Sequence, residues 1–352
     1  MKSWMHHAVR ACTVLLAAGV AHTALAASCA TSAAPRAVDY PWMSIERWRQ
    51  MHAEQVARAA QGGIDVMFVG DSLTEMWPKA LWDSNFGHLK AANFGIGGDH
   101  TGNVLWRLQD PAIAAIKPKL VVLMIGVNNI NLCKESADAV LGGIRAVVAR
   151  LRAQYPAARI LLNAVLPAGT AGSDVRRRLV ALNRRVRTLN DGETVFFRDY
   201  GARFMGADGN LSKELQPDLL HFSEKGYRLL ADAMRPDIEQ LLAPKPYVAV
   251  SPDGRTRLKV TAGEGKLAYT VTRDGATVIA QSPLGLSTSL GTLDGQSLRV
   301  DGSDSKVVSE TYRPVAGKAA SVADHYNEVE LRLVGKDQPF KLNVLARSRE
   351  SA

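Results

Sequence analysis

The chain of 352 residues and 38.0 kDa is long enough for two domains of ordinary size. Its hydrophobic share of 47% and charged share of 22% exclude a disordered or fibrous protein, and three cysteines are too few for a disulfide scaffold. Beyond the N-terminus, no apolar run approaches the roughly 20 residues of a membrane-spanning helix. We therefore expect a globular protein without a membrane span, and its formal charge is +9.

The N-terminus has the pattern of a secretory signal peptide. Lys2 and Arg10 form a basic start, small apolar residues follow at 11–21, and residues 24–26 (ALA) match an A-x-A cleavage site. We therefore predict that residues 1–26 are a signal peptide. The mature protein is then exported to the periplasm or to the extracellular space.

Cleavage after residue 26 changes the charge and the cysteine count. Loss of the two basic residues lowers the formal charge to +7 and leaves Cys29 and Cys133. An exported protein can form a disulfide between them, and two free thiols are the alternative that the sequence leaves open. A lipid anchor on Cys29 is less favoured, because a lipoprotein signal has leucine three residues before the cysteine, whereas Leu25 lies four residues before it.

Six arginines gather between residues 176 and 187, among apolar residues at helical spacing. This pattern predicts an amphipathic helix with a solvated basic face. Nucleic-acid binding would call for aromatic stacking residues or a known motif as well, and the sequence has neither. We therefore expect no nucleic-acid partner.

Residues 43–242 alternate between short, nearly continuous apolar runs and helical patterns. Such runs predict strands buried on both faces, and strands that alternate with helices indicate a parallel sheet covered on both sides. We therefore predict an α/β domain with three α/β/α layers. The predicted strands are 64–70, 91–96, 120–126, 159–166 and 194–198, and the longer predicted helices are 44–60, 137–154, 174–189 and 223–242.

The pattern changes after the segment 243–246 (APKP), which breaks the last predicted helix. Apolar and polar residues then alternate with a period of two, and Asp-Gly pairs mark turns, for example at 274–275. We predict that residues 247–352 form an all-β sandwich. The clearest predicted strands are 257–261, 267–272, 277–280 and 328–333.

Two glycine-containing blocks follow the first two predicted strands. Ser72 belongs to a Gly-Asp-Ser block at the carboxyl end of a strand, where functional loops of parallel sheets lie. Because residue 74 is threonine, the G-x-S-x-G elbow of the α/β-hydrolases does not fit. The second block, 93–99 (NFGIGGD), has glycines that let the backbone approach a ligand closely. It is no dinucleotide fingerprint, because residue 100 is histidine.

Two further blocks carry polar side chains. Asn128 and Asn129 follow the third predicted strand, where an amide can donate to developing negative charge. Asp218 precedes His221 by three residues, so its carboxylate can orient the imidazole and leave the other ring nitrogen free as a base. Each block by itself also fits an ordinary turn or a surface pair.

The joint order of the blocks (serine, glycine, asparagine, Asp-x-x-His) resembles the SGNH or GDSL hydrolases. The segment 93–108 (NFGIGGDHTGNVLWRL) is similar to the catalytic subunits of intracellular platelet-activating-factor acetylhydrolase and to their bacterial relatives. The resemblance covers about residues 60–242. It departs at Val127, where the related subunits commonly have threonine, and this change leaves the hydrogen-bond donors in place.

The resemblance implies a role for five residues. Ser72 is expected to be the nucleophile, and Asp218 and His221 complete the triad. The N–H groups of Ser72 and Gly98 and the side-chain amide of Asn128 are expected to form the oxyanion hole. Ester cleavage through an acyl-enzyme needs no cofactor and no metal, and the sequence contains no H-E-x-x-H motif or clustered Cys/His set.

The predicted sandwich resembles the N-terminal domain of glycoside hydrolase family 97 over about residues 248–347. The catalytic barrel of that family does not occur in this sequence, so the resemblance implies no glycosidase activity. All six tryptophans lie before residue 107, and a scaffold or a cover for the active-site rim is as good an interpretation as a sugar-binding module. The resemblance is carried by 250–254 (VSPDG), 266–271 (KLAYTV), 282–286 (SPLGL) and 324–328 (DHYNE).

We therefore expect an exported serine esterase that removes short acyl groups, acetyl above all, from carbohydrate. Esterases for short-chain phospholipids or lysophospholipids and thioesterases share the same mechanism and compete with this hypothesis. A non-catalytic carbohydrate-binding protein is an alternative of another class, and the intact set of five residues argues against it. The expected partner is an acylated carbohydrate or another small ester; the sugar, the acyl length and the oligomeric state stay open.

Overall fold

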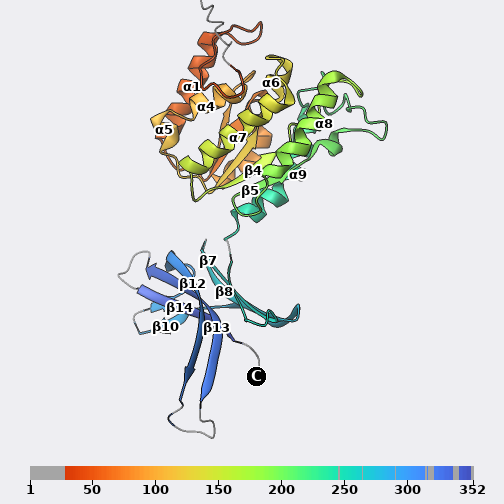
Figure 1. Ribbon diagram of the computed structural model, residues 1–352. Helices are drawn as coiled ribbons and strands as arrows, with labels where there is room; N and C mark the ends of the chain where they lie inside the picture. Colours follow the sequence, from red (N-terminus) through yellow and green to blue (C-terminus); the bar gives the residue numbers. More distant parts are fainter. Residues whose placement is uncertain are drawn as a thin grey trace, which may run out of the picture.

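The computed structural model describes residues 28–349, apart from 245, 264, 290, 314, 316–320 and 336–340. The predicted signal peptide at 1–26 lies outside the described residues. An α/β body and an all-β body follow one another along the chain, and the end of α9 leads from the first to the second (Figure 1). None of the helices in the described part of the chain combines the length and the apolar character that crossing a membrane requires.

The α/β body is built on a five-stranded parallel sheet with the order β2-β1-β3-β4-β5. Its central strands β1 and β3 are buried at every position, which explains why they are apolar almost throughout. The predicted parallel α/β fold is therefore confirmed. The strands are β1 (Val66–Gly70), β2 (Ala91–Gly95), β3 (Leu120–Met124), β4 (Arg159–Asn163) and β5 (Val195–Arg198).

Alternate side chains of the strands pack into two separate hydrophobic cores, one on each face of the sheet. Met67 and Val69 pack under α1, α4, α5, α7 and α8, while Val66 and Phe68 pack under α3 and α9. The helices therefore form the two outer layers of a three-layer body. Their bounds are α1 (Ile45–Ala60), α2 (Ser72–Glu75), α3 (Lys79–Phe86), α4 (Thr101–Arg107), α5 (Pro111–Ala114), α6 (Val127–Asn131), α7 (Ala137–Gln154), α8 (Asp174–Val186) and α9 (Glu224–Leu242), with short 3-10 turns η1 (Gly87–Leu89), η2 (Arg187–Leu189) and η3 (Gly201–Phe204).

The basic helix α8 differs from its prediction at one position. Arg176 is buried, and its guanidinium donates to the carbonyl oxygens of Ala168, Gly169 and Gly209. Four of the six arginines are exposed and Arg178 is half-buried, so most of the basic face is at the surface as expected. Arg176 instead fastens α8 to two loops, because buried carbonyl groups need donors.

The second body consists of antiparallel sheets, as predicted. A four-stranded sheet with the order β6-β7-β8-β9 and a three-stranded sheet with the order β12-β13-β14 share one apolar core, so they pack as a sandwich. A two-stranded ladder, β10 with β11, completes it. The strands are β6 (Tyr247–Val250), β7 (Thr256–Gly263), β8 (Lys266–Arg273), β9 (Ala276–Pro283), β10 (Leu286–Thr288), β11 (Gly291–Leu293), β12 (Leu298–Tyr312), β13 (Val322–Gly335) and β14 (Lys341–Arg349).

Candidate active site

The predicted site residues gather at the carboxyl edge of the parallel sheet. Strand order reverses at β1 and β3, because the chain leaves β1 for β2 on one side and later returns to β3 on the other. Ligand sites of open α/β sheets lie at such a switch point. Ser72 begins α2 directly after β1, Gly98 follows β2, and Asn128 lies in α6 after β3.

Ser72, His221 and Asp218 form a continuous hydrogen-bonded relay. The Oγ of Ser72 lies 2.9 Å from Nε2 of His221, and Nδ1 of the same ring lies 2.7 Å from Oδ2 of Asp218. Ser72 is 8% exposed, so its hydroxyl is shielded but reachable. In this arrangement the imidazole can accept the serine proton while the carboxylate holds the ring tautomer. The structure thus brings the three predicted triad residues together.

A tight turn brings Asp218 back toward His221. Leu219 has a φ of +64°, in the left-handed region that a leucine rarely occupies. The turn lets Oδ1 of Asp218 accept from the backbone N–H groups of Leu220 and His221, at 3.0 and 2.7 Å. Burial by itself would raise the pKa of Asp218, but these hydrogen bonds and that of the His221 ring hold the pKa of this carboxyl below its usual range. Asp218 is therefore ionised when it orients the imidazole.

The three predicted oxyanion donors come from segments that contact one another. A Cβ placed on Gly97 would lie 3.7 Å from Cβ of Ser72, so the glycine block lies against the serine. Gly98 has a φ of +75°, in the left-handed region that favours glycine. Among the described residues, no hydrogen bond engages the N–H of Ser72 or of Gly98. Asn128 donates one amide N–H to the carbonyl of Asp99 at 3.0 Å and keeps a second one.

Buried charges that the sequence analysis did not single out lie behind the glycine block. Asp99 is fully buried and accepts from Nε1 of Trp48 at 2.6 Å and from Nε of Arg107 at 2.8 Å. Oε2 of Glu75 accepts the N–H of Gly97, and Arg36 donates to the carbonyl of Gly97. Asp99 belongs to the glycine block 93–99 of the sequence analysis. No local sequence pattern predicts its partners Trp48 and Arg107, because they lie in other segments of the chain.

Asp71, next to the serine, is also completely buried. Its Oδ1 accepts from the N–H of Leu73 at 3.0 Å, and its Oδ2 has no hydrogen-bond partner within the described chain. Burial raises the pKa of Asp71 to about 7, and the nearby charges of Asp99 and Glu75 add to the rise. Asp71 therefore caps α2 and holds its proton to near-neutral pH.

A large cavity lies away from this site. It has a volume of about 680 Å³ and is lined by Lys119, Arg159 and Thr194, near the amino ends of β3, β4 and β5. None of its lining residues belongs to the triad or the oxyanion donors. Chemistry and strand topology, not cavity size, therefore locate the site.

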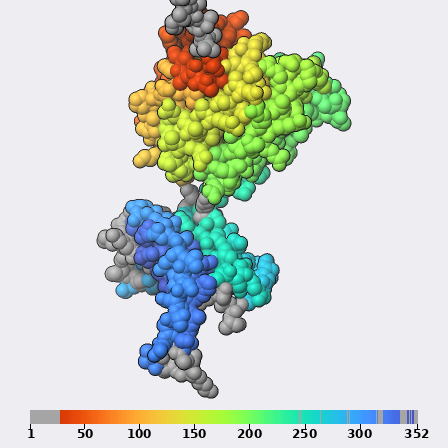
Figure 2. Space-filling model, viewed as in Figure 1, coloured from red at the N-terminus to blue at the C-terminus, as the bar shows by residue number. Residues whose placement is uncertain are grey.

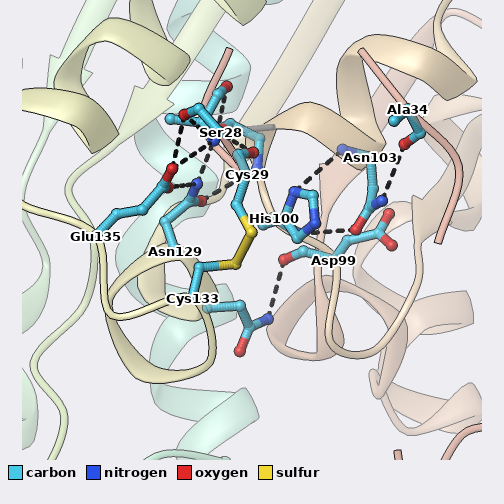
Figure 3. Close-up of a disulfide and its surroundings, with 12 residues drawn as sticks. Ser28, Cys29, Ala34, Asp99, His100, Asn103, Asn129, Cys133 and Glu135 are labelled. Carbon is cyan, nitrogen blue, oxygen red and sulfur yellow. Dashed lines mark hydrogen bonds between the residues drawn. A yellow bond between two sulfur atoms is a disulfide. The ribbon is translucent and has the colours of Figure 1, made fainter. Parts of the chain in front are cut away.

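One group of side chains offers three potential metal ligands. Atoms of Cys29, His100 and Cys133 lie within 4.8 Å of one another. The two cysteines form a disulfide, which settles the pairing that the sequence left open (Figure 3). A disulfide sulfur is no thiolate ligand, so this group does not fit a metal. Because its sulfur is in the disulfide, Cys29 has no free thiol to carry a lipid anchor.

Comparison with known sequences identifies the two bodies separately. Residues 68–229 match the GDSL-like lipase/acylhydrolase family, and residues 249–348 match the glycosyl-hydrolase 97 N-terminal family. The human platelet-activating factor acetylhydrolase IB subunit alpha1 is 35% identical over 199 residues, which cover 56% of this chain and 85% of that protein. The chain belongs to the GDSL-like lipase/acylhydrolase family.

Two further proteins match the same part of the chain. The alpha2 subunit of the same enzyme from Gallus gallus is 33% identical over 217 residues, which cover 61% of this chain and 93% of that protein. The solved structure of a GDSL-like lipase from Bacteroides thetaiotaomicron is 23% identical and covers 54% of this chain and 97% of its own, with a TM-score of 0.47. Membership of this esterase and acylhydrolase family makes the protein a hydrolase.

Proposed function

We propose that the protein is an exported serine esterase that removes acetyl or other short acyl groups from carbohydrate. The relay from Ser72 through His221 to Asp218 is the observation that carries this proposal. Serine is a weak nucleophile until a base takes its proton, and His221 is the base within hydrogen-bond distance. In this proposal the hydrolase domain spans residues 43–242 and the sandwich spans 247–352.

The proposed reaction has two halves. Oγ of Ser72 forms a bond to the acyl carbon while its proton moves to Nε2 of His221, and the carbonyl electron pair moves onto oxygen. The tetrahedral intermediate collapses, the C–O bond to the sugar breaks, and His221 returns the proton to the leaving sugar oxygen. Water then repeats the sequence on the acyl-enzyme and releases the acid.

Negative charge on the carbonyl oxygen needs donors that are already in place. The N–H groups of Ser72 and Gly98 and the second amide N–H of Asn128 supply three. Such donors need no reorganisation as the charge develops, and loss of one typically lowers the rate by about 10²- to 10³-fold.

A flat aromatic surface beside the glycine block, residues 93–99, supports a carbohydrate substrate. Trp42 is 60% exposed, and its ring stacks on Tyr40 with centroids 4.9 Å apart and planes at 8°. A Cβ on Gly98 would come within 3.2 Å of the Tyr40 ring, so this pair adjoins the proposed oxyanion hole. The C–H face of a sugar ring suits such a surface. The glycosyl-hydrolase-type sandwich supports the same substrate class.

The acetylhydrolase relatives favour a second candidate, an esterase for acetylated phospholipid. Their name assigns an acetyl group to the substrate, which agrees with our acyl group, but the alcohol differs. An assay with both kinds of substrate separates the two candidates. We expect faster acetate release from acetylated xylo-oligosaccharides than from a short-chain phospholipid at equal ester concentration.

Trp42→Ala tests the aromatic surface itself. We expect this variant to raise KM for acetylated oligosaccharide about tenfold, roughly the value of one aromatic contact, while KM for p-nitrophenyl acetate is unchanged. Val38→Ala is the matched control, because Val38 is also exposed, at 59%, on the same segment. Equal KM values for wild type and Trp42→Ala on the oligosaccharide would contradict a carbohydrate subsite at this place.

Export is part of the proposal. The pattern at residues 1–26 supports it, and so does the Cys29–Cys133 disulfide, because such bonds persist in oxidising compartments. The proposed location is therefore the periplasm or the extracellular space.

A further inference from the structure

A segment before the first helix is fastened to the loops of the site. We call residues 28–43 the N-terminal strap. The Cys29–Cys133 disulfide ties it to the segment after α6, and the carboxylate of Glu135 accepts from Ser28 at 2.7 Å (Figure 3). The side chain of Asn103 on α4 donates to the strap carbonyl of Ala34 at 3.0 Å. The strap is therefore fastened to the hydrolase body, and in Figure 2 the red start of the described chain lies against the rest of that body.

Arg36 is the charged residue that the strap buries. It is 4% exposed, and its Nη2 donates to the carbonyl of Gly97 at 2.6 Å and lies 3.4 Å from Oδ1 of Asp99. The guanidinium carbon lies 5.0 Å from the ring centre of Tyr40 and 5.8 Å from that of Trp48. Its Nε and Nη1 are buried and make no hydrogen bond within the described chain. A buried cation is costly unless it is paired, and Asp99 and the carbonyl of Gly97 are the partners that Arg36 has here.

The hydrogen bond from Arg36 acts on the peptide unit that carries a proposed oxyanion donor. The carbonyl of Gly97 and the N–H of Gly98 belong to one peptide unit, and in a trans peptide they point in opposite directions. A donor that holds this carbonyl on the buried side therefore holds the N–H on the opposite side. Both flanking residues are glycine, so without such a hold the unit could turn over at small steric cost.

Neighbouring contacts fix the rest of the loop but not this carbonyl. Glu75 accepts the N–H of Gly97, and Asn128 donates to the carbonyl of Asp99. Asp99 is held by Trp48 and Arg107. Among the described residues, Arg36 is the side chain that donates to the carbonyl of Gly97.

We propose that Arg36 is a positioning residue for the oxyanion hole, which it acts on through the Gly97–Gly98 peptide unit. The proposal rests on the proposed ester hydrolysis at Ser72. A cationic donor on the carbonyl also polarises the peptide unit and strengthens the N–H of Gly98 as a donor. The contribution belongs to the transition state, because the charge on the substrate oxygen appears there.

The test compares Arg36→Met and Arg36→Lys with wild type on p-nitrophenyl acetate. Methionine fills similar space without a donor, and Arg107 still neutralises Asp99. We expect kcat to fall about 10- to 100-fold for Arg36→Met, with KM within about twofold, and part of the loss to be restored in Arg36→Lys. Arg58→Met is the matched control, because Arg58 donates to the carbonyl of Gly62 at 2.8 Å at the far end of α1. It should leave kcat unchanged.

A second readout separates positioning from folding. A trifluoromethyl ketone adds to the active serine and needs the oxyanion donors, so its affinity should weaken by the same factor as kcat/KM. The concentration of active enzyme is measured by titration with a fluorophosphonate, and kcat is calculated from that concentration. Unfolded protein therefore does not lower the measured kcat. Unchanged kcat and ketone affinity in folded Arg36→Met would overturn the proposal. Activity retained in Ser72→Ala would overturn the proposed function instead.

Discussion

Asp71, the residue before the proposed nucleophile, makes the free energy of unfolding depend on pH. It is completely buried, and burial raises its pKa to about 7. In the unfolded chain a carboxyl of this kind loses its proton near pH 4. Between about pH 4 and pH 7 the folded state therefore binds one proton more than the unfolded state. The free energy of unfolding falls as pH rises through this window because of Asp71.

Asp71→Asn removes this dependence while it keeps an oxygen to accept from Leu73. The difference in unfolding free energy, variant minus wild type, should therefore increase from pH 4.5 to pH 8, by as much as about 4 kcal/mol. Urea unfolding at the two pH values measures the difference. The same difference between variant and wild type at both values would show that Asp71 is ionised throughout, and so would contradict a raised pKa.

Residues of the site differ in how far sequence can predict them. Ser72, Asn128 and His221 follow strands or precede a helix within short motifs, so their local context places them at one edge of the sheet. Arg36 has no such context, because its acceptor Gly97 lies 61 residues further along the chain. Pairing of buried charges depends on packing, which a local pattern does not contain.

The strap is the element on which the proposed positioning by Arg36 depends. Its sequence has no helical or strand period, and the pairing of its cysteine could not be decided from sequence. The disulfide closes a sequence separation of 104 residues. In the chain-entropy account a cross-link of this length stabilises a protein by about 4–5 kcal/mol.

A Cys29→Ser, Cys133→Ser double variant tests this element. Its free energy of unfolding should drop by about 3–5 kcal/mol, and kcat should fall because the strap holds Arg36 less firmly. Chemical denaturation and steady-state kinetics measure the two effects. Reductant should lower the stability of wild type but leave the double variant unaffected. Equal stability of wild type and double variant would contradict a strap held by the disulfide.

Long elements are predicted more reliably than short ones. The helix predicted at 137–154 has the observed bounds of α7, because eighteen residues give several full turns of periodicity. The helices α2, α4, α5 and α6 were not predicted, since four to seven residues are too few to establish a period. Two of these short helices, α2 and α6, begin directly after β1 and β3 and carry Ser72 and Asn128. Their polar motifs, not their periodicity, pointed to the site.

At the scale of the whole molecule, the sequence pattern indicates where the α/β body ends and the all-β body begins. Near-continuous apolar runs gave way to period-two alternation after residue 246, and the structure changes there from a parallel sheet to antiparallel sheets. The strand order could not be predicted in this way, because periodicity says which face a residue occupies but not which strand is its neighbour. The order β2-β1-β3-β4-β5 is what brings Ser72, Gly98 and Asn128 to one switch point.

The proposed function depends above all on Ser72 as the residue that carries the acyl group. The most direct measurement is the hydrolysis of p-nitrophenyl acetate by the full chain and by Ser72→Ala, with Ser84→Ala as a control serine on α3. We predict a loss of about 10⁴-fold or more in kcat for Ser72→Ala and none for Ser84→Ala. A rate near that of wild type in folded Ser72→Ala would contradict Ser72 as the nucleophile.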